Sequence, residues 1–279
     1  MFRPAITEQG RTRVASASGQ DREEPLLEGS GITKYFGAIT ALNDVGFRLQ
    51  RGEVLGVVGD NGAGKSTLMK ILSGLYAPSE GHLAFEGRKV RFASPRDARI
   101  HGIEMVYQDL ALAGNMPIFE NIYLGREPGR RVLGLNIIDQ KRARDMAAAH
   151  LERLKIQVKS VDQNVEELSG GQRQAVAIGR ATAFDARIVI MDEPTAALAI
   201  KEVGKVLDLI KSLKDHGVGV ILISHRMDDV FYVCDRVMAL FPGRNFAEAP
   251  LAATTRNEVI GWIMGTKDHR DELAHDRVH

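Results

Sequence analysis

Glycines, a lysine and a serine are spaced in one short stretch so that together they could hold the phosphates of a nucleotide. The stretch GDNGAGKS, residues 59–66, matches the pattern G-x-x-x-x-G-K-[ST]. Glycines let backbone amides approach an anion closely, Lys65 is expected to reach the outer phosphates, and Ser66 offers an oxygen to Mg²⁺. A plain glycine-rich turn is the alternative, but an apolar run precedes the stretch and a helical pattern follows it. The expected nucleotide-binding residues are Gly59, Asp60, Asn61, Gly62, Ala63, Gly64, Lys65, Ser66 and Thr67.

Two adjacent carboxylates, Asp192 and Glu193, end the apolar run RIVIMDE. Neighbouring side chains of an extended chain point to opposite faces, so the two acids can do different work. We expect Asp192 to face Mg²⁺ through water and Glu193 to face an attacking water. Two solvated acids in a loop would look the same in isolation, but beside a phosphate-binding loop they indicate phosphoryl chemistry.

A second element suited to phosphate lies 109 residues further on, in LSGGQ, residues 168–172. Ser169 and Gln172 have the spacing of a capping box, which predicts the start of a helix. Gly170 and Gly171 leave the first amides of that helix open, and a helix N-terminus attracts an anion. The residues alone also allow an ordinary capped helix, so they do not explain why one chain carries two such elements.

Four short apolar runs must position these groups, and each ends in a polar or turn-forming residue. Continuous apolar runs without alternation are typical of strands buried on both faces of a parallel sheet. Helical spacing of apolar residues between them predicts an α/β fold with helices covering a mostly parallel sheet. Ligands bind at the carboxyl ends of such strands, so Gln108 and His225 should converge with the loop and the two acids. The runs are Val54–Gly59, Ile103–Gln108, Arg187–Glu193 and Val218–His225.

Composition limits the classes of function. The chain has 279 residues, 44% hydrophobic and 26% charged, with a formal net charge of +1, which gives no reason to expect a nucleic-acid partner. A single cysteine, Cys234, excludes a disulfide within the chain. No run approaches the length of a membrane span. Residues 1–24 are expected to form a mobile N-terminal arm and residues 266–279 a polar C-terminal tail.

Together these motifs resemble the ATP-binding subunits of ABC transporters over about residues 27–265. The stretch 59–66 resembles their Walker A, IVIMDE their Walker B, and LSGGQ their signature motif. Gln108 resembles the Q-loop glutamine and His225 the switch histidine. Phe36 resembles the aromatic residue that stacks on adenine, although its neighbour Tyr35 competes for that role.

The resemblance implies a P-loop NTPase fold of the ABC type. A mostly parallel core sheet with flanking helices would be joined by an N-terminal antiparallel β part and a helical subdomain at about 115–167, within a domain at 25–265. It implies ATP and Mg²⁺ as cofactors, with Ser66, Gln108 and Asp192 toward the metal and Glu193, His225 and Lys65 as catalytic residues. The signature would contact ATP bound to a second subunit, in a head-to-tail homodimer. Its residues are Leu168, Ser169, Gly170, Gly171 and Gln172.

The stretches GITKYFGAITALNDV and YQDLALAGNMPIFENIYLGRE are similar in sequence to half-size import ATPases for ribose, xylose and fructose. This implies membrane permease subunits, a periplasmic sugar-binding protein as an indirect partner, and a peripheral place on the cytoplasmic face of a bacterial inner membrane. One departure is Ala199, where many members have the aspartate of the D-loop, so the two sites are expected to be less coupled.

Three other functions stay open at this point. The chain could be an ABC ATPase for another cargo, such as an amino acid, lipid or drug, which the permease would reveal. It could be a non-transport ABC protein acting on nucleic acid or ribosomes, which salt-sensitive nucleic-acid binding would reveal. It could be a regulatory subunit without turnover, although Lys65, Asp192, Glu193 and His225 are all present.

Overall fold

The computed structural model describes residues 24–132 and 135–266 of the 279-residue chain. Within them, six strands form the central sheet. Neighbouring strands pair in parallel, except that β11 and β12 are antiparallel. The four apolar runs form strands of this mostly parallel sheet, as predicted, and the structure places them side by side as β3, β10, β9 and β6. The order is β12 (Asn245–Pro250), β11 (Arg236–Leu240), β3 (Val54–Val58), β10 (Gly219–Ile223), β9 (Ile188–Asp192) and β6 (Ile103–Val106).

Strand register brings the carboxyl ends of these strands to one edge. Ile223 at the end of β10 pairs with Asp192 on one side and with Val57 on the other. Val106 at the end of β6 pairs with Met191. The phosphate-binding loop, the two acids, Gln108 and His225 therefore leave the sheet at the same edge.

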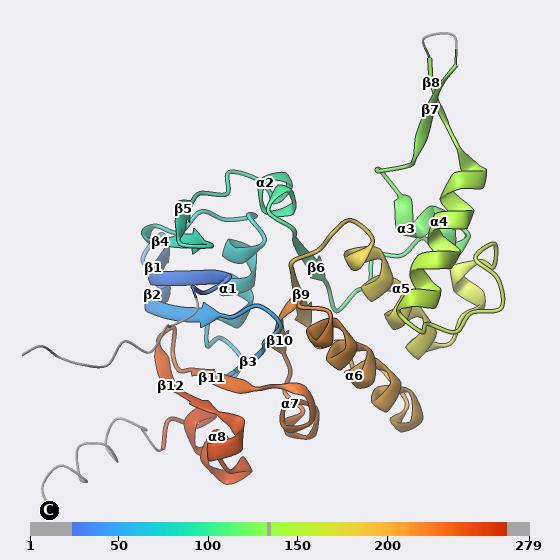
Figure 1. The fold of residues 1–279 in the computed structure, drawn as a ribbon. Helices are drawn as coiled ribbons and strands as arrows, with labels where there is room; N and C mark the ends of the chain where they lie inside the picture. Colours follow the sequence, from blue (N-terminus) through green and yellow to red (C-terminus); the bar gives the residue numbers. More distant parts are fainter. Residues whose placement is uncertain (1–23, 133–134, 267–279) are drawn as a thin grey trace, which may run out of the picture.

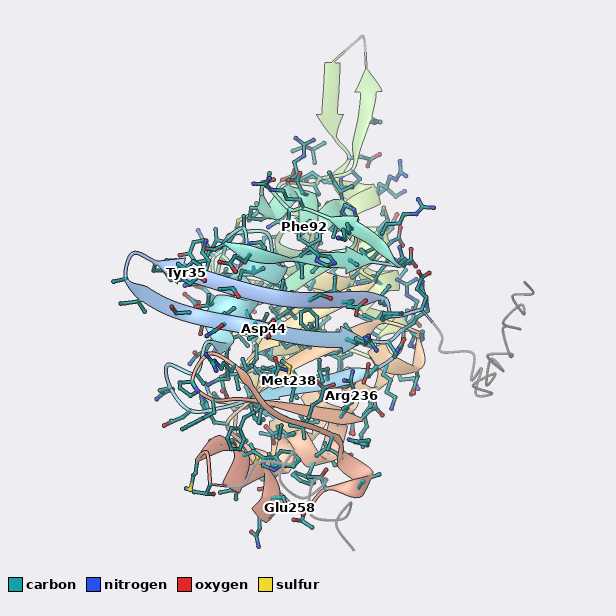
Figure 2. All side chains as sticks on the ribbon, turned by 90° about the vertical axis from the view of Figure 1, so that its left-hand side faces the viewer. Tyr35, Asp44, Phe92, Arg236, Met238 and Glu258 are labelled. Carbon is teal, nitrogen blue, oxygen red and sulfur yellow. The ribbon has the colours of Figure 1, made fainter. Side chains whose placement is uncertain are left out.

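A second, antiparallel sheet packs beside the first and contains the N-terminal strands, which confirms the expected antiparallel β part. It lies at one end of the molecule in Figure 1, and Figure 2 shows β1 and β2 running across that face with Tyr35 toward their hairpin end. The sheet order is β2 (Ile39–Leu49), β1 (Leu27–Phe36), β4 (Glu80–Phe85) and β5 (Arg88–Val90). Helix α2 (Pro95–Ile100) follows β5 and leads into β6.

Helices cover both faces of the central sheet. On β9, Ile188 and Ile190 pack into one buried cluster, which includes helix α1 (Lys65–Leu72), while Val189 and Met191 pack into another. The second cluster contains residues of α5 (Gly170–Thr182) and α6 (Ile200–Asp215). This alternation explains why the strand sequence is apolar throughout, since both faces are buried. Helices α7 (Met227–Val233) and α8 (Arg256–Ile263) belong to a third cluster against β11.

The segment between Gln108 and the signature forms the end of the molecule opposite the antiparallel sheet (Figure 1). Its helices α3 (Ile118–Tyr123) and α4 (Gln140–Arg153) share a separate hydrophobic cluster with Val176 of α5. The Asp139 side chain accepts a hydrogen bond from the Arg142 amide at 3.0 Å and so begins α4 at the predicted residue. A hairpin of β7 (Gly129–Val132) and β8 (Leu135–Ile138), which was not expected, projects from this part.

The expected N-terminal arm and C-terminal tail lie almost wholly outside the described residues. Among the residues described, no helix combines the length and apolar character needed to cross a membrane. The boundaries of the helical subdomain, 115–167, stay a prediction, although most of the residues of its hydrophobic cluster fall between Ile118 and Leu168.

Candidate nucleotide site

The loop between β3 and α1 takes a backbone shape that depends on glycine. Gly62 has φ +82° and Gly64 has φ +100°, in the left-handed region that other residues rarely adopt. A Cβ on Gly64 would lie 2.6 Å from Cδ2 of Leu42 and 2.8 Å from the Ala41 carbonyl oxygen, so β2 also requires a glycine there. Helix α1 then begins at Lys65 and directs its free amides toward the loop.

Lys65 is held inside this loop. The residue is 7% exposed, and Nζ donates hydrogen bonds to the carbonyl oxygens of Gly59 at 2.7 Å and Asp60 at 3.0 Å. Burial lowers the pKa of Lys65, and the nearby carboxylates of Glu193, Asp60 and Asp192 oppose that shift. The ammonium group is therefore kept at the base of the loop, among acids, by two backbone carbonyls.

A cavity of about 290 Å³ opens at the carboxyl edge of the sheet and joins the chemical groups that the sequence places far apart. The predicted convergence is confirmed: the phosphate-binding loop, Gln108, both acids and His225 all line it. Of the predicted loop residues, Gly59, Asp60 and Ala63 form the loop behind the lining. The lining residues are Ala41, Asn61, Gly62, Gly64, Lys65, Ser66, Thr67, Gln108, Asp192, Glu193, Ile223 and His225.

Glu193 is placed by an unusual backbone. It has φ +49°, and its amide donates to the Ile223 carbonyl oxygen at 2.9 Å, which ties the end of β9 to the end of β10. The His225 amide lies 3.4 Å from Oε2 of Glu193, and Nε2 of His225 lies 3.3 Å from Oε1 without good hydrogen-bond geometry. Oε1 is thus buried with no hydrogen-bond partner among the described residues, and Glu193 is one of the residues that line the cavity.

Burial raises the pKa of Glu193, and His225 partly offsets the shift. Burial also raises the pKa of Asp192, against the pull of Lys65 and His225. Both carboxyl groups are therefore more basic than a solvated acid. Such a group attracts either a proton or a cation, because its charge is incompletely compensated by the protein.

The donor set on this cavity fits Mg²⁺. A hydroxyl oxygen from Ser66, an amide oxygen from Gln108 and a carboxylate from Asp192 lie on one small polar cavity, and hard cations prefer such oxygen ligands. Burial of Asp192 with a raised pKa is the structural sign that this carboxylate lacks a full counter-charge.

Phe36 does not line this cavity. It lies at the end of β1, is 41% exposed, and meets the Tyr76 ring edge-on at 5.4 Å between centroids. Tyr35 is 44% exposed, but its hydroxyl donates to Oε1 of Glu80 at 2.9 Å. Both rings are therefore partly exposed at the end of β1, and the adenine-stacking role of Phe36 stays a prediction.

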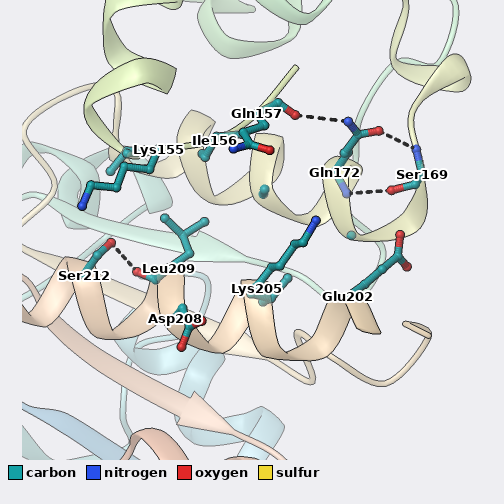
Figure 3. A pocket seen from close by; sticks show the side chains of 14 residues that line it. Lys155, Ile156, Gln157, Ser169, Gln172, Glu202, Lys205, Asp208, Leu209 and Ser212 are labelled. Atoms are coloured by element: carbon teal, nitrogen blue, oxygen red, sulfur yellow. Dashed lines mark hydrogen bonds between the residues drawn. The ribbon is translucent and has the colours of Figure 1, made fainter. Parts of the chain in front are cut away.

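The signature residues lie elsewhere. Ser169 caps α5 by accepting from the Gln172 amide at 3.3 Å, and the Gln172 side chain accepts from the Ser169 amide at 3.1 Å, which confirms the capping box. Ser169, Gly171 and Gln172 line a different cavity of about 650 Å³ between α5 and α6 (Figure 3). One chain therefore does not join its own signature to its own Lys65 cavity in this structure.

Two residues that the sequence reading missed hold the segment after Gln108. Arg180 of α5 donates to the carbonyl oxygens of Leu110 and Ala111, both at 2.7 Å. The fully buried Asn121 side chain bonds the backbone of Ala113, Met116 and Pro117. Neither residue belongs to a spacing pattern, so only the tertiary structure identifies them.

Comparison with known proteins agrees with this geometry. The family model for ABC transporters matches residues 42–196. The chain is 47% identical over 219 residues to the xylose/arabinose import ATP-binding protein of Sulfolobus acidocaldarius, covering 78% of this chain and 86% of that protein. It is 42% identical over 250 residues to the fructose import ATP-binding protein of Rhizobium meliloti, covering 88% and 96%. It spans about half of the ribose import ATP-binding protein of Streptomyces coelicolor, at 42% identity.

Solved structures give the same answer. A nucleotide-free ATP-binding cassette from an ABC transporter superimposes with a TM-score of 0.74 at 29% identity, covering 86% of this chain and 95% of that one. A dimeric cassette in a post-hydrolysis state, bound to ADP and phosphate, superimposes with a TM-score of 0.67 at 27% identity, covering 81% and 98%. The chain therefore belongs to the ABC transporter family and is an ATP-binding, ATP-hydrolysing cassette.

Proposed function

We propose that this cassette powers the import of a monosaccharide through a separate membrane permease, by closing as a head-to-tail dimer around two ATP molecules. The head-to-tail dimer is supported by the separation of the signature from the Lys65 cavity within one chain. Similarity to named xylose/arabinose and fructose import proteins over most of their length supports the sugar cargo. The chain would lie on the cytoplasmic face of the inner membrane, with a periplasmic sugar-binding protein as an indirect partner.

Each residue of the cavity then has a role in hydrolysis. Lys65 leaves the Gly59 and Asp60 carbonyls and binds the β- and γ-phosphate oxygens. Glu193 accepts a proton from, or orients, the water that attacks the γ-phosphorus, and the bond to the β–γ bridging oxygen breaks. His225, whose Nε2 lies beside Glu193, holds the γ-phosphate and that water. Phe36 stacks on the adenine, and the residues of the loop 59–67 enclose the phosphates.

Ser66, Gln108 and Asp192 would hold Mg²⁺, the latter two partly through water. When bound, the metal ion neutralises charge that develops on the phosphate oxygens in the transition state. Gln108 begins the segment that Arg180 and Asn121 hold, so a movement of Gln108 is transmitted to residues 110–117. We place the permease contact on this segment and on the helical subdomain.

Closure needs the γ-phosphate. Ser169 and Gly171 of one subunit would bind the γ-phosphate on the Lys65 loop of the other, so ATP favours the closed dimer and ADP does not. Hydrolysis then removes the bridge between the subunits. This mechanism explains two phosphate-suited elements in one chain: each is half of a composite site.

Glu193→Gln tests the mechanism. Loss of the basic carboxylate should lower steady-state ATP hydrolysis by about 100-fold or more, the usual contribution of a general base, and should trap an ATP-bound dimer. Turnover by phosphate release and dimer mass by sedimentation would be measured with ATP and with ADP. Glu28→Gln, on β1 beside Arg48, removes the same charge far from the cavity and should behave as the parent. Normal ATP turnover in Glu193→Gln would contradict the catalytic role assigned to Glu193.

The cargo is tested separately. The chain would be co-purified with its membrane partners and assayed for ATP hydrolysis stimulated by xylose, fructose or ribose with their binding protein. Stimulation by an amino acid, lipid or drug instead would favour a different cargo and leave the ATPase mechanism intact.

A further inference from the structure

The groove between α5 and α6 brings an acidic side chain onto the signature. Glu202, at the third position of α6, places its carboxylate against the start of α5, where Oε2 would lie 3.5 Å from a Cβ added to Gly170 and where the Ser169 hydroxyl and the Gly171 amide stabilise its charge. A Cβ added to Gly171 would lie 2.8 Å from Cβ and 3.1 Å from Cδ of Glu202, so the glycine permits this close approach. Figure 3 shows the Glu202 carboxylate rising from α6 toward Ser169.

The donors that Glu202 uses are the ones suited to a phosphate. The first amides of α5 are free of helical partners, and the helix end favours a negative charge. Ser169 Oγ accepts from the Gln172 amide at 3.3 Å, so its hydrogen is available to an anion, and the Glu202 carboxylate is the anion beside it. Ser169 and Gly171 lower the pKa of Glu202, so the group is a carboxylate at neutral pH.

We propose that Glu202 is an internal competitor for the signature, holding Ser169 and Gly171 in the free subunit until the γ-phosphate bound to a partner subunit displaces it. This rests on the proposed function, in which those two residues contact the partner's ATP. A carboxylate and a terminal phosphate are both anionic acceptors, and the Ser169 hydroxyl and Gly171 amide cannot serve both at full strength.

The structure provides a place for the displaced carboxylate. Lys205 is three residues further along α6, on the same face, and its charge already stabilises the ionised Glu202. Both side chains border the open 650 Å³ groove, which leaves space beside Glu202 on the side of Lys205. Dimer closure would therefore exchange Ser169 and Gly171 for Lys205 as the partner of Glu202.

A competing role and a structural role for Glu202 predict opposite changes in the stability of the ATP dimer when Glu202 is removed. If Glu202 only reinforced the start of α5 or α6, its removal would loosen the signature and weaken the ATP dimer. As a competitor, it opposes the dimer, so its removal strengthens it. The direction of the change therefore decides between the two.

The test uses full-length chain carrying Glu193→Gln, with dimer dissociation constants measured by sedimentation in ATP. Adding Glu202→Gln or Glu202→Ala should tighten the dimer by about two- to five-fold for each of its two sites, the range of one charge at an exposed helix N-terminus. Nucleotide affinity of the monomer, measured with ADP, should not change. Asp208→Asn removes the same charge from α6, where Asp208 bonds the Tyr232 hydroxyl, and should leave the dimer as in the parent.

The outcomes distinguish a failure of the proposed function from a failure of the role assigned to Glu202. Absence of an ATP dimer in the Glu193→Gln parent would overturn the proposed function and this inference with it. A parent dimer that Glu202→Gln and Glu202→Ala leave unchanged or weaken would overturn the inference alone. Equal tightening by Asp208→Asn would also overturn it, because a general loss of negative charge on α6 would then be the cause.

Discussion

Lys65 and Glu193 show how single residues are prepared for a ligand. Lys65 is satisfied by two carbonyls of its own loop, whereas Oε1 of Glu193 is buried and has no hydrogen-bond partner among the described residues. A buried acceptor without a partner costs about 1–3 kcal/mol, so Glu193 gains most when a water or proton reaches it. The left-handed backbone of Glu193 holds it in this position, which is common where strain serves a site.

The two neighbouring rings on β1 give a prediction for one residue. Phe36→Ala should weaken ATP affinity by about 1–3 kcal/mol, the usual loss when an aromatic platform is removed from a base. Tyr35→Ala is the matched control and should leave the ATP affinity within a few tenths of a kcal/mol of the parent, because Phe36 is the ring proposed to stack on the adenine. Titration calorimetry with ATP measures both. A larger loss for Tyr35→Ala would assign stacking to Tyr35.

At the scale of elements, the strands were predictable and several contacts were not. The four apolar runs predict strands of the central sheet because burial on both faces removes polar residues from them. Ser169 and Gln172 predict the start of α5 because a capping box is local. The hairpin β7–β8 and the contact of Glu202 with Ser169 were missed, since they depend on packing between elements and have no local spacing pattern.

The contact between α4 and α5 gives a prediction for pH. His150 is buried, with Nε2 2.9 Å from the Gly179 carbonyl oxygen and Nδ1 2.9 Å from the Arg153 guanidinium. Nε2 therefore donates, Nδ1 accepts, and the ring is neutral. Burial lowers the pKa of His150 below its ordinary value of 6.5. As pH falls below 6.5, the unfolded chain takes up this proton before the folded one, so stability declines.

The measurement is the free energy of unfolding in urea between pH 7.5 and pH 5. The parent should lose stability as pH falls from 6.5 toward the lowered pKa, beyond what His150→Gln loses over the same interval. His150→Gln keeps a donor for Gly179 but cannot titrate, so the difference between the two curves isolates His150. Parallel curves would show that His150 does not contribute to the pH dependence.

At the scale of the whole molecule, the fold separates two half-sites by placing Lys65 at the edge of the sheet and Ser169 at the start of α5. A central sheet covered on both faces fixes the first, whereas α5, which carries the second, packs both on that sheet and on the helical part at the far end of Figure 1. The two halves of a site in one dimer then come from different chains, which a mixing experiment can detect.

Ser169→Arg should spare nucleotide binding by the monomer but abolish the ATP dimer, because a bulky side chain blocks the signature while the Lys65 cavity is intact. Lys65→Met should lose nucleotide binding.

Each variant alone forms no ATP dimer, yet a mixture of the two variants should form one, because the heterodimer contains one site with wild-type Lys65 and wild-type Ser169. Because Ala199 replaces the D-loop aspartate, the two sites are expected to be less coupled, so one intact site should be enough to hold the heterodimer closed. Sedimentation of the mixture in the Glu193→Gln background measures this. If the two half-sites acted within one chain, mixing would restore nothing, since every chain carries one broken half.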